Sequence, residues 1–253
     1  MANIVLAHGI LGFGENPFSI GINYFNGVKK ALRECGHNVF APSVDPLGSL
    51  DHRSGQLAGA IAEYWPGDSE ISVIAHSMGG LDTRSIIAKH GSVGRRIKNL
   101  VTIATPHLGS PVADAVLNKT NGLHKYIPAR LLDVFKANSG AIDDLRKRES
   151  LHDPDCPGVR YMEVVCVPPA SVSVTSPLFE LARALGELEG ENDGLVAGTS
   201  ACCHPRAPIE LWPVDHNGAI GWPSHLFGLA AVPALLKPPA DHIERYVALA
   251  RRF

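Results

Sequence analysis

The sequence has little net charge and no long uninterrupted apolar run. It carries 23 Lys and Arg against 25 Asp and Glu, for a formal net charge of -2 and a pI near 6.6. No basic excess therefore points to nucleic acid or to an anionic membrane surface. The longest apolar stretches, such as His225–Leu236, are interrupted by Pro and Gly and fall short of the roughly 20 residues that cross a bilayer. We expect neither a nucleic-acid partner nor integral membrane association.

The sequence also lacks a paired cysteine motif and a signal peptide. Its 5 cysteines are an odd set without a C-x-x-C pair, which argues against a zinc site, and free thiols in a reducing cytoplasm are favoured. Behind Met1 the chain becomes apolar with no basic n-region or cleavage site. We expect a cytoplasmic protein if Met1 is the native start, and a secreted one if a leader was removed. The cysteines are Cys35, Cys156, Cys166, Cys202 and Cys203.

Short apolar runs alternate with segments of helical periodicity. Such alternation predicts an α/β fold, with a mostly parallel central sheet, right-handed crossovers and helices on both faces. The length of 253 residues fits one domain spanning residues 1–253. A helical cap or lid insertion is expected over residues 111–150, and a loop system over Gly186–Ala201. The predicted strands are Asn3–Ala7, Asn38–Ala41, Glu70–Ala75, Ile97–Ala104, Val159–Val167 and Ile209–Val214, and the predicted helices are Tyr24–Gly36, Ser54–Tyr64, Gly80–His90 and Ile243–Arg252.

Ser77 lies between a predicted strand and a predicted helix, in the sequence Ala75-His76-Ser77-Met78-Gly79-Gly80. A strand, a tight turn with Ser at its apex and a helix make up the nucleophile elbow of serine hydrolases. The strained backbone needs small residues two positions before and after the Ser. Ala75 and Gly79 meet this need, although Ala75 replaces the usual Gly. The alternative is an ordinary turn in which Ser77 caps the helix N-terminus.

The loop His8-Gly9-Ile10-Leu11-Gly12 directly follows the first predicted strand. In a serine hydrolase the negative oxygen of the tetrahedral intermediate is held by two backbone N–H groups, one after the nucleophile and one from an earlier loop. Met78 is the candidate for the first donor and Ile10 for the second. His8 is expected to be a hydrogen-bonded structural residue rather than a base.

A general base and its carboxylate must follow Ser77 in the chain order nucleophile, acid, histidine. His216 is the preferred base because it follows a predicted strand end, over the other candidates His204, His225 and His242. Asp193 is the preferred acid, since Asp215 neighbours His216 in sequence and is expected to point away from it. The alternative for Asp193 is an ordinary Asn-Asp-Gly turn.

The opening block Ile4-Val5-Leu6-Ala7-His8-Gly9-Ile10-Leu11-Gly12-Phe13 resembles the start of bacterial triacylglycerol lipases of the pseudomonad type, a family of the α/β-hydrolase superfamily. Further blocks resemble family segments in the same order, so the resemblance covers most of the chain. These blocks are Tyr24–Gly27 with Ala31–Arg33, Arg53–Leu57, Ala75–Leu81, Thr105–Ser110, Asn192–Val196 and Asp215–His216. The resemblance implies an α/β-hydrolase fold and a structural role for Arg53 as anchor of the oxyanion loop. At matching positions it implies the nucleophile Ser77, the acid Asp193, the base His216 and the oxyanion donors Ile10 and Met78.

Two departures from the family pattern concern calcium and the lid. The family holds a structural calcium through an Asp before the acid loop and another two residues after the catalytic His. Here the first region is shortened around Leu181–Gly190 and the second position is Gly218, so we expect no metal and no cofactor. The lid region Ala113–Ser150 is short, which questions interfacial activation. The family often carries a disulfide, and Cys156 with Cys202 or Cys203 occupies comparable places; the sequence does not decide between this bond and free thiols.

These features together predict a serine carboxylic ester hydrolase that acts through an acyl-enzyme. Lipid-like or medium-chain acyl esters are the expected substrates, and lipid-interface contact is expected through the lid. Apolar residues near the oxyanion loop are candidates for an acyl pocket or for ordinary core. They are Ile10, Leu11, Phe13, Phe18 and Ile20. The alternatives are a polyester or polyhydroxyalkanoate depolymerase and, in another class, a non-catalytic binding protein on a hydrolase fold.

Overall fold

A computed structural model describes most of the chain. The described residues are 1–12, 14, 23–118, 120, 122–127, 129–137, 139–169, 179–203, 207–222 and 241–253. The predicted acyl-pocket residues Phe13, Phe18 and Ile20 and the histidines His204 and His225 lie outside them.

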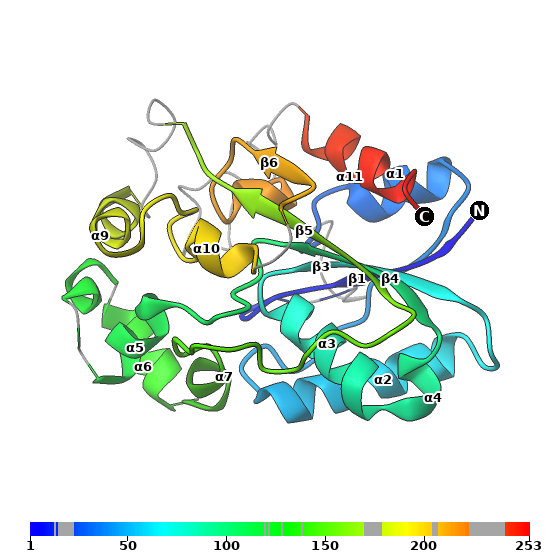
Figure 1. Cartoon of the computed structure of the whole chain (residues 1–253), viewed down its shortest axis with the longest axis horizontal. Coiled ribbons are helices and arrows are strands. Elements are labelled where there is room, and N and C mark those ends of the chain that lie inside the picture. Colours follow the sequence, from blue (N-terminus) through cyan, green and yellow to red (C-terminus); the bar gives the residue numbers. More distant parts are fainter. Residues whose placement is uncertain are drawn as a thin grey trace.

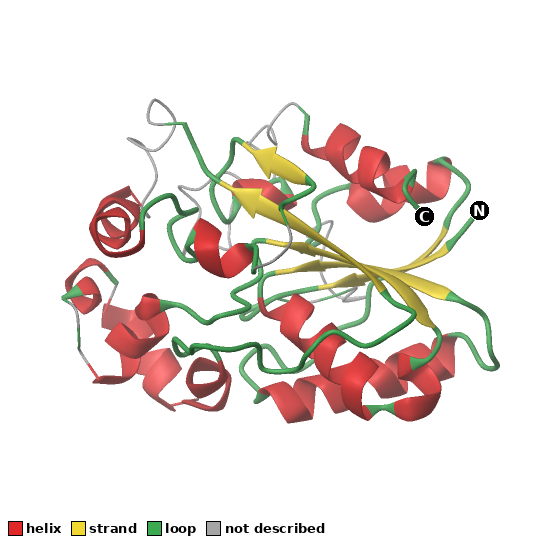
Figure 2. Ribbon diagram, in the orientation of Figure 1, coloured by secondary structure: helices red, strands yellow, loops and turns green. Residues whose placement is uncertain are grey.

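A parallel six-stranded sheet forms the centre of the molecule (Figures 1 and 2). Its order is β2-β1-β3-β4-β5-β6, and every neighbouring pair is parallel. All carboxyl ends of the strands therefore lie at one edge, where the βα loops gather. The strands are β1 (Asn3–Ala7), β2 (Asn38–Phe40), β3 (Ile71–His76), β4 (Ile97–Ile103), β5 (Arg160–Cys166) and β6 (Glu210–Trp212). The parallel sheet predicted from the sequence is confirmed.

Helices cover both faces of the sheet (Figure 1). One face carries α1 (Val28–Glu34) and α11 (His242–Ala250), and the other carries α2 (Leu50–Tyr64), α3 (Met78–Lys89) and the short α4 (Gly91–Gly94). Successive β1 side chains belong to opposite cores: Ile4 and Leu6 pack on the first face, Val5 and Ala7 on the second. Burial on both faces explains the continuous apolar runs of the central strands.

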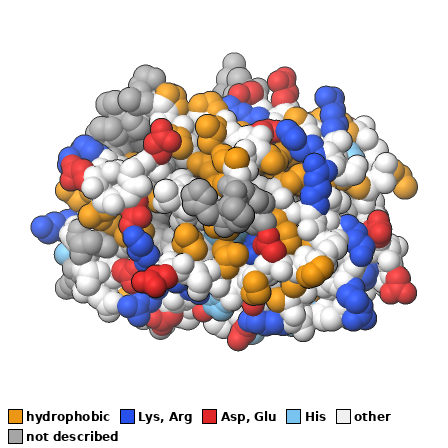
Figure 3. Space-filling view, viewed as in Figure 1, with side chains coloured by type: hydrophobic (Ala, Val, Ile, Leu, Met, Phe, Trp, Pro, Cys, Tyr) orange, Lys and Arg blue, Asp and Glu red, His pale blue; other side chains and the backbone are white. Residues whose placement is uncertain are grey.

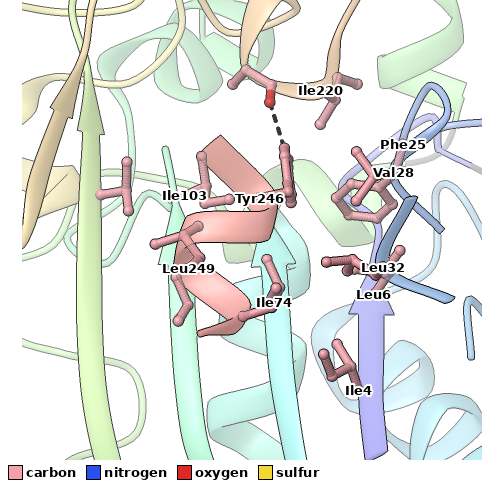
Figure 4. Close-up of a cluster of buried hydrophobic side chains, with 14 of the residues drawn as sticks. Ile4, Leu6, Phe25, Val28, Leu32, Ile74, Ile103, Ile220, Tyr246 and Leu249 are labelled. Atoms are coloured by element: carbon pink, nitrogen blue, oxygen red, sulfur yellow. Dashed lines mark hydrogen bonds between the residues drawn. The ribbon is translucent and has the colours of Figure 1, made fainter. Parts of the chain in front are cut away.

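The core beneath α1 and α11 is shown in Figure 4. Phe25 meets Tyr246 edge to face, with ring centroids 5.9 Å apart. Tyr246 is fully buried, and its hydroxyl donates to the Ala219 carbonyl oxygen at 3.0 Å. This bond ties α11 to η2 (Gly218–Ile220), the turn that follows His216. The C-terminal helix therefore supports the loop that carries the predicted base.

A group of helices follows β4, in the region where the sequence suggests a helical cap. They are α5 (Pro111–Asn118), the 3-10 helix η1 (Leu123–Tyr126), α6 (Ala129–Ala137) and α7 (Ser139–Asp144). With α9 (Phe179–Glu189) they gather at one end of the sheet, at the left of Figure 1. Their apolar side chains form one cluster that also contains Met78 and Leu81 of α3. The helical insertion thus packs on the helix that follows Ser77.

Three predictions differ from the structure by more than two residues. The helix predicted from Tyr24 begins only at Val28, because Gly27 has a left-handed φ of 74° and the preceding segment bonds elsewhere. The helix predicted from Ser54 begins at Leu50, where the Ser49 hydroxyl accepts the His52 N–H. The loop predicted over residues 186–201 contains the last turn of α9 and the short helix α10 (Gly198–Ala201). Each difference arises from tertiary contacts or caps that periodicity does not register.

On the face drawn in Figure 3, acidic and basic side chains are interspersed around the edge, and hydrophobic side chains gather toward the middle. Neither sign of charge forms a large patch there, in keeping with the small net charge. Among the described residues, none of the helices has both the length and the apolar character needed to span a bilayer.

Two glycines test how closely the helices pack on the sheet. A β-carbon on Gly79 would lie 2.4 Å from the Ala7 carbonyl oxygen, whereas one on Gly59 would meet nothing within 4 Å. Gly79→Ala is expected to lower the free energy of unfolding by about 1–3 kcal/mol, because β1 and α3 must move apart. Gly59→Ala is the control in α2 and should raise it by about 0.5–1 kcal/mol. Urea denaturation measures both; equal effects of the two variants would contradict the close approach.

Candidate active site

Ser77 forms the turn between β3 and α3 in a strained backbone conformation, with φ 54° and ψ -130°. A positive φ at a non-Gly residue persists only where its surroundings enforce it. Here the Ser77 N–H donates to the Ile103 carbonyl oxygen at 2.9 Å, and the Thr105 hydroxyl donates to the Ser77 carbonyl oxygen at 2.8 Å. The Ser77 side chain makes no capping hydrogen bond to α3. The geometry is that of a nucleophile elbow rather than of an ordinary helix cap.

The loop after β1 lies directly against Ser77. A β-carbon on Gly9 would fall 2.8 Å from the Ser77 Cβ and 3.2 Å from its Oγ. Only glycine therefore lets the backbone approach the hydroxyl this closely. Among the described residues, neither the Ile10 nor the Met78 backbone N–H donates to another protein group. Both donors predicted for an oxyanion hole are thus available in the loop and helix that flank Ser77.

His8 sets the orientation of the Gly9–Ile10 peptide. Its Nε2 accepts the Val44 N–H at 3.0 Å, so its proton is on Nδ1, which donates to the Gly9 carbonyl oxygen at 2.8 Å. In a trans peptide the N–H points opposite to the C=O, so holding this carbonyl also aims the Ile10 N–H. Burial, with the nearby charge of Arg53, lowers the pKa of His8 to about 4. His8 is therefore neutral near pH 7 and has the structural role expected from the sequence.

Arg53 ties the same loop to α3. It is fully buried, and its guanidinium donates to the His8 carbonyl oxygen at 2.9 Å and to the Asp45 carbonyl oxygen at 2.7 Å. The Arg53 Nε and Nη2 groups also donate to the Asp82 carboxylate, and Nη2 lies 2.7 Å from Oδ2. Burial raises the pKa of Asp82 to about 6, although Arg53 opposes the shift. Arg53 thus connects the His8 carbonyl to Asp82 of α3.

Asp193 and His216 come together although they are 23 residues apart. The Asp193 Oδ2 lies 2.7 Å from His216 Nδ1, and Oδ1 accepts the backbone N–H groups of Leu195 and Val196 at 2.9 and 2.7 Å. Both side chains are buried. Because Nδ1 is bonded to the carboxylate, Nε2 is the nitrogen left to exchange a proton with a nucleophile.

The other candidates for base and acid have different partners. The Asp215 Oδ1 accepts the Gly218 N–H at 2.8 Å and so caps the turn after His216. His242 is the first residue of α11, and its Nε2 lies 2.6 Å from the Asn26 carbonyl oxygen. Asp193 is therefore the acid that contacts the His216 ring.

His216 lies beside the nucleophile turn. Its ring centroid is 4.5 Å from that of His76, the residue before Ser77. His76 also contacts Tyr24, whose hydroxyl oxygen is 2.7 Å from His76 Nδ1. Sequence reasoning overlooked both His76 and Tyr24 as site residues. Their adjacency to motif residues was the available signal, but nothing in the chain indicates a contact across 52 positions.

The residues present do not fit the calcium site of the resembling family. At Gly218 a β-carbon would lie 3.0 Å from Val214 Cβ and 3.2 Å from Asp215 Oδ1, so the turn is tightly packed at the position where the family has its second Asp. Asp215 itself is engaged by the Gly218 N–H. The region before the acid loop lies in α9, where Leu181 and Leu185 are buried against the helical insertion. Within the described residues, His, Cys, Asp and Glu side chains form no group of three suited to a metal ion.

None of the 5 cysteines, all of which lie in the described residues, forms a disulfide in the structure. Cys203 is buried, with its sulfur 3.4 Å from Glu163 Oε1, whereas Cys156 lies in the loop before β5. The disulfide that the resemblance suggested between Cys156 and Cys202 or Cys203 is not formed.

The chain is similar in sequence to known proteins. Residues 56–139 match the family of PGAP1-like alpha/beta domains. Triacylglycerol lipase 2 of Saccharomyces cerevisiae is 30% identical over 223 residues, which cover 81% of this chain and 64% of the yeast protein. These similarities support a lipase family of the α/β-hydrolase superfamily. A triacylglycerol lipase of Pseudomonas fragi is 33% identical over 114 residues, 44% of this chain and 36% of that protein.

The α/β-hydrolase fold is also found in solved structures. Staphylococcus hyicus lipase superposes with a TM-score of 0.70 at 17% identity, over 99% of this chain and 95% of that chain. At this identity the likeness concerns the fold. The matched part of the chain spans less than two thirds of the length of the yeast and Pseudomonas relatives named above.

Removing Arg53 tests the anchor of the oxyanion loop. Arg53→Met leaves the Asp82 carboxylate buried without its partner and is expected to lower the free energy of unfolding by about 3–5 kcal/mol. Combining it with Asp82→Leu should recover most of that loss, because no unpaired charge remains. Amide hydrogen exchange in residues 8–12 should rise in both variants, since the His8 carbonyl has lost its donor. A double variant with wild-type exchange in this loop would contradict the anchoring role.

Proposed function

We propose that the protein is a serine carboxylic ester hydrolase, a lipase or esterase, with Ser77, His216 and Asp193 as its catalytic triad. The observation that carries the proposal is the convergence of three chain segments at one edge of the sheet. The strained Ser77 turn, the Gly9 loop pressed against it and the Asp193–His216 pair beside it supply nucleophile, oxyanion donors and base. Its lipase relatives support the same chemistry.

In the proposed mechanism Ser77 Oγ attacks the ester carbonyl carbon while His216 Nε2 takes the hydroxyl proton. The Asp193 carboxylate holds the imidazole through Nδ1 and stabilises the imidazolium. The negative oxygen of the tetrahedral intermediate accepts the N–H groups of Ile10 and Met78. Collapse expels the alcohol, which takes the proton from His216. A water molecule, deprotonated by His216, then attacks the acyl-enzyme and releases the acid.

Lipid-like or medium-chain acyl esters are the proposed substrates. Met78 is fully buried in the apolar cluster of the helical insertion, and Ile10 packs against the same cluster. The two oxyanion donors therefore lie beside apolar packing, which suits a site for an acyl chain. Of the other predicted pocket residues in the described chain, Leu11 is exposed, with 38% of its surface accessible, and is not assigned to the pocket.

Residues 111–150 are proposed to act as a short cap or lid on a single domain spanning residues 1–253. The cap and the adjoining α9 share a buried apolar cluster with α3. On their outside they expose large apolar side chains: Tyr126, Val134 and Leu188 are 37%, 41% and 50% accessible. Apolar groups on the outside of a cap favour contact with a lipid interface.

Ser77→Ala tests the proposed reaction. The wild-type protein should hydrolyse medium-chain p-nitrophenyl esters and emulsified triglyceride, and Ser77→Ala should reduce kcat by roughly 10⁴-fold or more, as in other triad knockouts. The variant should fold normally by circular dichroism, because the Ser77 hydroxyl caps no helix. Substantial turnover by a cleanly folded Ser77→Ala protein would assign the chemistry to another group.

Asparagine substitutions at two neighbouring acids distinguish their roles. Asp193→Asn should lower kcat by about 10⁴-fold, because an amide does not hold the imidazole in the required tautomer. Asp215→Asn is the matched control: its amide oxygen can still accept the Gly218 N–H, so kcat should stay within about tenfold of wild type. Steady-state kinetics on one p-nitrophenyl ester compares them, and the reverse order would exchange the two assignments.

A further inference from the structure

Tyr24 lies at a junction of the three segments that build the proposed site. Its hydroxyl oxygen accepts the Gly9 N–H at 3.0 Å, from the oxyanion loop, and lies 2.7 Å from His76 Nδ1, beside the nucleophile. Its ring packs against those of His8 and His76, at centroid distances of 5.6 and 5.7 Å. One phenol therefore connects the loop after β1 to the end of β3.

The backbone around Tyr24 is bonded to the third segment, the loop after His216. The Trp222 indole N–H donates to the Tyr24 carbonyl oxygen at 2.9 Å. The Asn26 N–H donates to the Ile220 carbonyl oxygen at 3.1 Å, and the Asn26 side-chain amide donates to the Gly221 carbonyl oxygen at 2.9 Å. Residues 24–26 are thereby held between the oxyanion loop, the nucleophile turn and the histidine loop. These bonds explain why this segment is not helical.

The groups around the Tyr24 hydroxyl determine which hydrogen bond it accepts and which it donates. The Gly9 N–H can only donate, so it occupies one acceptor position of the hydroxyl oxygen. Burial raises the pKa of Tyr24, which keeps the phenol protonated and able to donate to His76 Nδ1. Burial and the neighbouring His216 hold the pKa of His76 well below its ordinary value, so this ring is neutral.

Burying the polar ring of His76 is unfavourable for stability, so its contact with Tyr24 calls for a role. It is 1% exposed, and its Nε2 has no hydrogen-bond partner among the described residues. Its Nδ1 lies 2.7 Å from the Tyr24 hydroxyl oxygen, and its ring centroid lies 4.5 Å from that of His216. A buried polar ring with half of its hydrogen-bonding capacity unmet is disfavoured relative to an apolar side chain. Its contacts connect Tyr24 to the proposed base.

We propose that Tyr24 and His76 are positioning residues that fix the oxyanion loop and the His216 ring relative to Ser77. The inference rests on the proposed function. The Tyr24 hydroxyl fixes the orientation of the Gly9 N–H, one peptide before the Ile10 N–H. It also fixes the ring of His76, against which His216 packs. Neither side chain transfers a proton in the proposed mechanism. Their effect is on the transition state, because they place the donors and the base rather than the bound ester.

The test is Tyr24→Phe, which keeps the ring and removes the hydroxyl. On a p-nitrophenyl ester kcat should fall about 10- to 100-fold with KM changed less than about threefold, because displacement of catalytic groups by a fraction of an ångström costs this much. An alkyl boronic acid, which forms a tetrahedral adduct on a serine nucleophile, should lose affinity by a similar factor. Tyr161→Phe is the control, since its hydroxyl also accepts a backbone N–H, from Cys156 at 2.9 Å, at the far end of β5. It should retain wild-type kinetics.

His76 variants separate positioning from a general loss of stability. His76→Phe should reproduce the fall in kcat, and His76→Asn, which keeps a polar atom near the Nδ1 position, should restore part of it. The double variant Tyr24→Phe/His76→Phe should be no slower than either single variant, because both remove the same bridge. Additive losses, or a Tyr24→Phe protein with unchanged kcat and boronate affinity, would overturn the bridge. A wild-type protein inert to ester and boronate would overturn the proposed function itself, and the inference with it.

Discussion

The end of β1 lies so close to the turn between β3 and α3 that neither Gly9 nor Gly79 has room for a β-carbon. The parallel pairing of β1 with β3 brings these two chain ends to the same edge of the sheet. Because the approach is backbone to backbone, it places the Gly9–Ile10 peptide next to the Ser77 hydroxyl without any side chain between them. The oxyanion donors, the strained nucleophile turn and the proposed positioning bridge all depend on this approach.

Buried polar groups hold this close packing in place without leaving a free charge at the site. Arg53 is paired with Asp82 and caps the His8 carbonyl, while His8 and His76 are neutral because burial lowers the pKa of each. A neutral His76 beside His216 is important for the proposed chemistry. A second cation 4.5 Å from His216 would oppose formation of the imidazolium.

The sequence predicts the sheet and the motif residues well because their signals are local. Strands buried on both faces are continuous apolar runs, and the turn residues Ala75, Gly79 and Gly9 are small where the backbone must approach closely. The start of α1 was predicted four residues early because Tyr24 to Asn26 bond to residues about 200 positions away. Helix α9 was not predicted from the sequence, and its Leu181 and Leu185 pack on the helical insertion, a tertiary contact. The Tyr24–His76 contact is long-range in the same sense, so chain order and spacing do not indicate it.

The central claim is that Ser77 is a nucleophile activated by the Asp193–His216 pair, and covalent labelling tests it most directly. A fluorophosphonate should modify the wild-type protein at one site, located at Ser77 by peptide mass spectrometry. In His216→Ala, labelling should slow by several orders of magnitude, since the hydroxyl then lacks its base. A folded wild-type protein that takes up no label, or takes it up at another residue, would contradict the account and would favour a binding role for this fold.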